Sequence, residues 1–143
     1  MIQGKNTITY NNLEEVFADS YQIDLLINNE KYEYDNNNQE YYKILVLFDE
    51  MLTGSREVPA LGVSLDNETR KAIKNGVWLE FNYDITRYNN DLPFDSLLIE
   101  VNQNYGGFNI IRKYNNKYEG RCFYINLENN SKMNKLYNYL TDK

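Results

Sequence analysis

Four polar side chains in the last third of the chain have types and spacing that could do chemistry: Arg112, Glu119, Arg121 and Tyr124. Arginine binds carboxylates and phosphates through a fixed fork of N–H donors, so this set could hold an anionic ligand beside a sheet. Neighbouring Cys122 would become a reactive thiolate if Arg121 lowered its pKa. In a regular strand, however, adjacent residues point to opposite faces, and a buried cysteine is commonly only a small apolar side chain.

The residue inventory excludes most familiar catalytic centres. The chain contains no histidine, which removes serine–histidine and cysteine–histidine nucleophile pairs and histidine metal ligands. A single cysteine cannot build a structural zinc site, and the sequence has neither a phosphate-binding loop nor a dinucleotide fingerprint. We therefore expect no catalytic residue, no metal and no cofactor. A small enzyme or anionic-ligand-binding protein that uses the arginine cluster is the alternative to a binding protein without catalysis.

The negative charge of the chain is concentrated near its beginning. Residues 1–52 hold 10 acidic and 3 basic side chains, a net charge of −7, whereas residues 53–143 hold 11 and 12, a net charge of +1. Such asymmetry is a hint about partners. Direct nucleic-acid binding by the acidic part is not expected, because phosphates must be neutralised by lysine and arginine. The charge favours a partner protein with a basic surface.

A sharper form of this hypothesis assigns the contact to five carboxylates. They are Glu14, Glu15, Asp24, Glu33 and Asp35. Their partner would be a basic protein that normally handles nucleic acid, and the chain would act as an inhibitor of the immunity or phage anti-defence type. Electrostatic complementarity would speed the association and make it sensitive to salt. The alternative is a solvated sheet face on which these charges bind nothing, and the pattern leaves the oligomeric state open.

A run of antiparallel strands must position the arginine cluster. Apolar and polar side chains alternate through four segments, as in a sheet with one face on a core. The segments are residues 77–84, 96–104, 107–114 and 119–128. On the opposite, outer face, Trp78 would lie beside Glu80 and Glu100. An exposed tryptophan there could anchor a protein contact, but such a side chain is more often covered by another helix.

Two asparagine pairs predict tight hairpin turns, because asparagine tolerates the positive φ that two-residue loops require. The pair at 28–29 predicts a hairpin over residues 21–35, in which Asp24 lies directly opposite Glu33. The pair at 115–116 joins the last two strands of the meander. Counting back from that turn, Arg112 faces Glu119, and Ile110 faces Arg121.

Helical spacing of apolar residues predicts a central helix over 39–52, apolar around most of its circumference, and a C-terminal helix over 132–140. Asn37 is the expected N-cap of the central helix, and Gly54 ends it. Short helices are expected near 11–20 and 67–74, a short strand at 5–10, and loops over 55–65 and 85–95.

These elements together predict one compact α+β domain over residues 1–143. It contains an antiparallel meander of about four strands over 77–128, an N-terminal hairpin, the central helix, and the C-terminal helix packed on the sheet. There is no leading basic-then-apolar segment and no apolar run near 18 residues, so a membrane is not an expected partner. A lone cysteine fits a reducing compartment, and we expect the protein in the cytoplasm.

Overall fold

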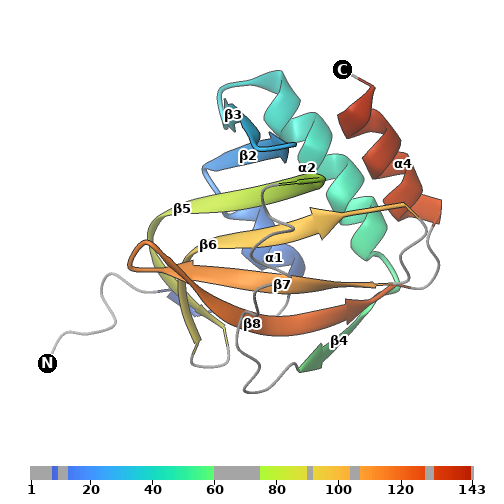
Figure 1. Ribbon diagram of the computed structural model, residues 1–143. Helices are drawn as coiled ribbons and strands as arrows, with labels where there is room; N and C mark the ends of the chain where they lie inside the picture. Colours follow the sequence, from blue (N-terminus) through green and yellow to red (C-terminus); the bar gives the residue numbers. More distant parts are fainter. Residues whose placement is uncertain are drawn as a thin grey trace, which may run out of the picture.

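The computed structural model describes residues 8–9, 13–59, 75–89, 92–103, 107–127 and 131–142. It is an α+β structure in which three helices of the described part pack on one mainly antiparallel sheet (Figure 1). The helices are α1 (Leu13–Ala18), α2 (Gln39–Leu52) and α4 (Ser131–Thr141). The strands are β1 (Ile8–Thr9), β2 (Gln22–Ile27), β3 (Glu30–Asp35), β4 (Arg56–Pro59), β5 (Val77–Asn89), β6 (Leu92–Val101), β7 (Gly107–Tyr114) and β8 (Lys117–Asn126).

Within the described residues the strand order is β3-β2-β5-β6-β7-β8-β4, with the short β1 paired in parallel with β5. The predicted meander is therefore present as β5 to β8. The predicted N-terminal hairpin, β2 and β3, belongs to the same sheet because β2 pairs antiparallel with β5. No sequence pattern predicted this attachment, which places β3 at one edge of the sheet (Figure 1).

Both asparagine turns are confirmed. Asn28 and Asn29 have φ values of 49° and 70°, and Asn115 and Asn116 have 53° and 65°. Two consecutive positive φ values give the turn whose twist matches that of antiparallel strands. The first turn sets the predicted register of β2 and β3 along the whole hairpin, including the pairing of residues 24 and 33.

The second hairpin keeps its predicted register for only two pairs. Beyond them, bulges in β8 shift the pairing, so that Arg112 lies opposite Gly120, and Arg121 lies opposite Ile111. The predicted pairings of Arg112 with Glu119 and of Ile110 with Arg121 are therefore wrong. Each bulge adds an unpaired residue to one strand, and alternation counted from the turn cannot reveal it.

Two segments predicted as loops contain strands. β5 continues to Asn89 and β6 begins at Leu92, so most of the predicted 85–95 loop belongs to these two paired strands. Their pairing is irregular here, because residues 83–86 lie opposite residue 95 alone. The Thr86 hydroxyl donates to an Asp95 carboxylate oxygen at 2.7 Å, which ties the two arms together. β4 occupies part of the predicted 55–65 loop and pairs with β8. The predicted helix at 67–74 lies outside the described residues.

Helix α2 has the predicted bounds, but its N-cap lies one residue later than expected. The cap is Asn38, not Asn37, and its side-chain oxygen accepts a 2.8 Å hydrogen bond from the backbone N–H of Glu40. The predicted stop at Gly54 is confirmed, because this residue follows the C-cap Thr53 and has φ 78°, a conformation that costs glycine little.

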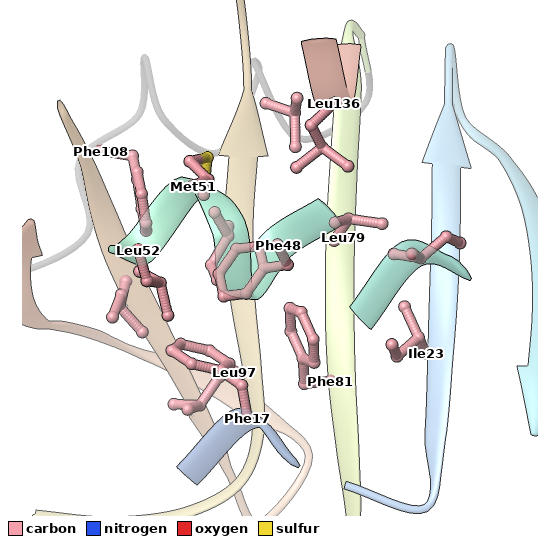
Figure 2. Close-up of a cluster of buried hydrophobic side chains, with 14 of the residues drawn as sticks. Phe17, Ile23, Phe48, Met51, Leu52, Leu79, Phe81, Leu97, Phe108 and Leu136 are labelled. Atoms are coloured by element: carbon pink, nitrogen blue, oxygen red, sulfur yellow. The ribbon is translucent and has the colours of Figure 1, made fainter. Parts of the chain in front are cut away.

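We call the face of the sheet on which α1, α2 and α4 pack the helix face. α2 and α4 lie side by side on it (Figure 1). The core between the layers centres on Phe48 of α2, whose ring centroid lies 4.7 Å from Phe17 of α1 and 4.9 Å from Phe81 of β5 (Figure 2). Leu136 of α4 is buried in the same cluster. This packing fixes the position of β5, and hence of β2 and β3.

Replacing Phe48 with alanine should lower the free energy of unfolding by about 3–5 kcal/mol, because a fully buried ring leaves a cavity among its neighbours. Urea denaturation followed by circular dichroism measures the change. The matched control is Val46→Ala on the same helix, whose side chain is 57% exposed and whose loss should change stability by about 0.5 kcal/mol or less. Equal effects of the two substitutions would contradict the described packing.

Candidate functional site

β3 is an exposed edge strand with acidic side chains. Five of its six residues are exposed, and within the described part of the chain its one strand neighbour is β2. Glu30, Glu33 and Asp35 are all exposed, and we call these three residues the acidic edge. Lys31 is the one basic residue of the strand, so β3 carries a net charge of −2.

The two faces of β3 differ because residues of a strand alternate. Tyr32 and Tyr34 pair with Leu25 and Ile23 on the helix face, and Tyr34 is partly buried against the core there. Lys31, Glu33 and Asp35 pair with β2 residues of the outer face. The buried aliphatic residues of β2 thus anchor the hairpin and leave the carboxylates of Glu33 and Asp35 at the rim.

A row of carboxylates runs inward from this rim. Glu33 lies opposite Asp24, and Asp24 lies opposite Glu80 of β5. Asp24 is only 3% exposed, and its carboxylate accepts hydrogen bonds from the side-chain amides of Gln22 at 2.8 Å and Asn82 at 2.9 Å. These two donors satisfy the buried charge. Asp24 therefore sits inside a polar network and is not exposed, although both its predicted contact with a partner and the alternative of a solvated face required exposure.

Glu80, also 3% exposed, accepts a hydrogen bond from the hydroxyl of Tyr118 at 3.2 Å. Burial raises the pKa of Glu80; the Lys113 charge opposes this rise, and the negative charge of Asp24 adds to it. Burial also raises the pKa of Tyr118, and the neighbouring Glu80 charge raises it further. Tyr118 therefore remains a hydrogen-bond donor over the physiological pH range.

The outer face around this row is covered rather than bare. Trp78, Leu98 and Ile111 form a second buried cluster there, and Trp78 is only 2% exposed. The indole N–H of Trp78 donates to the carbonyl of Asn75 at 3.0 Å. Of the two alternatives for Trp78, the exposed anchor for a partner is therefore wrong, and the side chain is covered. The two buried carboxylates of the row, Asp24 and Glu80, accept hydrogen bonds from side chains of neighbouring strands, so they help to fix the register of the sheet.

A buried arginine that was not predicted from the sequence lies near the end of β5, in the part of the strand that was expected to be a loop. Arg87 is 4% exposed and makes ion pairs with Asp19 at 2.9 Å and with Asp84 at 3.0 Å. Its guanidinium also lies 5.5 Å from the ring centre of Tyr83. Arg87, Asp19 and Asp84 border a polar hollow of about 310 Å³ between α1, α2 and the end of the β2–β3 hairpin. The burial of Arg87 was not predicted, because residues 85–95 were expected to form a loop and an arginine in a loop is usually exposed to solvent.

The five predicted partner-binding carboxylates do not share one surface. Glu33 and Asp35 are exposed on the acidic edge, and Asp24 is buried behind them. Glu15 is exposed on α1, which packs on the helix face, whereas the Glu33 and Asp35 positions belong to the outer face. The side chain of Glu14 lies outside the described residues.

The alternative arginine cluster is only partly described. Arg112 donates from Nη1 to the carbonyl of Pro93 at 2.9 Å, so its guanidinium is tied to the neighbouring hairpin arm. The side chains of Glu119, Arg121 and Tyr124 lie outside the described residues, as does that of Cys122. Arg112 also pairs with Leu97, a core residue of the helix face, whereas the backbone partner of Arg121 is Ile111 of the outer-face cluster.

Comparisons with protein-family models, with curated proteins and with solved structures find no match for the chain. In the residues described, no group of three or more cysteine or acidic side chains is arranged to hold a metal ion. Among the helices of the described ranges, none has the length and apolarity needed to cross a membrane. The acidic edge and its supporting hairpin are therefore interpreted from their own geometry.

The raised pKa of Glu80 predicts a specific pH dependence. Between the ordinary pKa of 4.5 and the raised folded value, the folded state holds more protons than the unfolded state, so stability falls as pH rises. Glu80→Gln keeps an acceptor for Tyr118 and removes this titration. The stability of the variant relative to wild type should therefore be higher at pH 8 than at pH 4. Urea midpoints at these two pH values measure it, and an equal difference at both would contradict the prediction.

Proposed function

We propose that the protein is a small cytoplasmic binding module without catalysis, which contacts a basic surface of another protein through the acidic edge of its sheet. The single observation that carries this proposal is the exposure of Glu30, Glu33 and Asp35 along one edge strand. A rim of like charges steers an oppositely charged partner and speeds its association. The proposed partner is a basic protein that handles nucleic acid, which the module would inhibit, as in immunity or phage anti-defence systems.

The exposure of these carboxylates supports binding, and the Asp35 carboxylate has a local structural role as well, because it accepts a hydrogen bond from the backbone N–H of Asn37. The outer-face carboxylates Asp24 and Glu80 are buried with hydrogen-bond donors, whereas Glu33 and Asp35 are exposed. Aligned negative charges at an edge repel one another, and a basic partner would relieve this repulsion. Glu33 and Asp35 therefore replace the original set of five as the proposed contact, with Glu30 added.

Reversing the acidic edge should weaken capture of the partner by roughly tenfold, since attraction becomes repulsion at two rim positions. The variant is Glu33→Lys/Asp35→Lys, compared with wild type in a pull-down from cells that naturally make the protein. Mass spectrometry identifies the captured proteins, and each is then purified and its affinity measured at about 50 mM and about 300 mM salt.

The matched control is Glu50→Lys/Asp142→Lys, which makes the same change in net charge on α2 and just after α4. The proposal is supported if one basic protein binds wild type and the control equally, binds the edge variant more weakly, and dissociates as the salt concentration rises. Equal binding of that protein by the edge variant and the control would refute the acidic edge as the contact.

A further inference from the structure

Among the described residues, β3 has no strand neighbour on its outer side, and the free backbone there adds a second feature to the acidic edge. In a two-residue hairpin the residues flanking the turn form a hydrogen-bonded pair, and such pairs then alternate along the strands. The backbone N–H of Asn36 donates to the carbonyl of Tyr21 at 3.0 Å, which continues this alternation beyond the strand end. Tyr32 and Tyr34 therefore bond to β2, and the backbone groups of Lys31 and Glu33 point away from it.

The end of this free edge is defined by Asp35. Its carbonyl accepts from the N–H of Asn38 at 2.9 Å, and its carboxylate accepts from the N–H of Asn37 at 2.9 Å. The free hydrogen-bonding groups therefore run from Lys31 to the N–H of Asp35. A segment of this length can pair with one added strand, which is a recurring way in which sheets bind peptides.

Charge decides which strand would fit. Residues that face Glu33 and Asp35 in an added strand lie two positions apart and on the same face. Lysine or arginine at both positions would lie opposite a carboxylate. The basic residue opposite Glu33 would also extend the row from Glu80 through Asp24 to Glu33 with a positive charge. Apolar residues at the alternate positions would face Tyr32 and Tyr34, and an acidic residue would oppose Lys31.

We propose that the free edge of β3 accepts an extended basic segment of the partner as an additional antiparallel strand, with the pattern basic–apolar–basic–apolar–acidic. This inference rests on the proposed function, because it names the part of the basic partner that the acidic edge binds. A second copy of the chain fits less well: the pairing that places Lys31 opposite Asp35 also places Glu33 opposite Glu33, with repulsion at its centre.

The test uses a capped peptide with the core Lys-Val-Lys-Val-Glu, titrated into the full-length protein and followed by NMR at low salt. In the proposed pairing the N–H groups of the second lysine and of the glutamate bond to the carbonyls of Glu33 and Lys31, and the valine N–H groups face away. Methylating these two amide nitrogens should weaken binding by about tenfold or more, since two hydrogen bonds are lost. Methylating the two valine amides should change affinity by about twofold or less.

A scrambled peptide with adjacent lysines and the same composition tests the pattern, and it should also bind about tenfold more weakly. Two protein variants provide an independent test. Lys31→Thr and Lys31→Pro both remove the positive charge, but only proline removes an outward N–H. If charge alone matters, both variants bind the basic peptide more tightly than wild type does. Strand addition predicts that Lys31→Pro binds more weakly than Lys31→Thr.

The outcomes separate the two proposals. Equal binding of the valine-methylated peptide and of the peptide methylated at its second lysine and its glutamate would overturn strand addition and leave the acidic edge as a charged contact. Absence of binding by every basic peptide, together with unchanged pull-down by the charge-reversed edge, would overturn both. Association of the free protein through β3 into a dimer, seen by sedimentation and blocked by Lys31→Pro, would assign the edge to a second copy and overturn the basic partner.

Discussion

The contact among three phenylalanine rings, one each from α1, α2 and β5, is the constraint on which the other parts depend. Phe17, Phe48 and Phe81 meet at centroid distances below 5 Å and are fully buried. Aromatic rings in such tilted contacts bury large areas and hold a defined geometry. Because Phe81 pairs with Ile23 across β5 and β2, the same contact fixes the N-terminal hairpin on the sheet. Without it, β3 would have no fixed edge to present.

The two sides of the hairpin then serve different purposes. On the side toward β5, Asp24 and Glu80 are buried on the outer face and accept hydrogen bonds from side chains of other strands. The sheet must therefore keep its register for both buried carboxylates to have their hydrogen-bond donors. Away from β5, Glu33 and the backbone on either side of it face solvent. A carboxylate row that is satisfied at its inner end and exposed at its outer end is suited to receive a positive charge from outside. The fold thereby places the negative charge of the N-terminal third where a partner strand can reach it.

Local signals in the sequence were sufficient for the first hairpin and for α2. Paired asparagines determine a turn by their φ preference, and strict alternation carries the register from it, so Glu33 and Asp35 could be placed correctly. The burial of Asp24 could not be predicted, because it depends on pairing with a strand far along the chain. The bulges of β8 escaped detection for a different reason: an extra residue such as Glu119 leaves no mark in the alternation.

Amide hydrogen exchange along β3, measured by NMR on the isolated protein, tests the central claim of a free, acidic edge most directly. We expect alternation: slow exchange at Tyr32 and Tyr34, whose N–H groups bond to β2, and fast exchange at Lys31 and Glu33. Slow exchange at Lys31 and Glu33 would mean that another part of the chain or a second copy already occupies this edge. That result would contradict the proposed binding of a partner at β3.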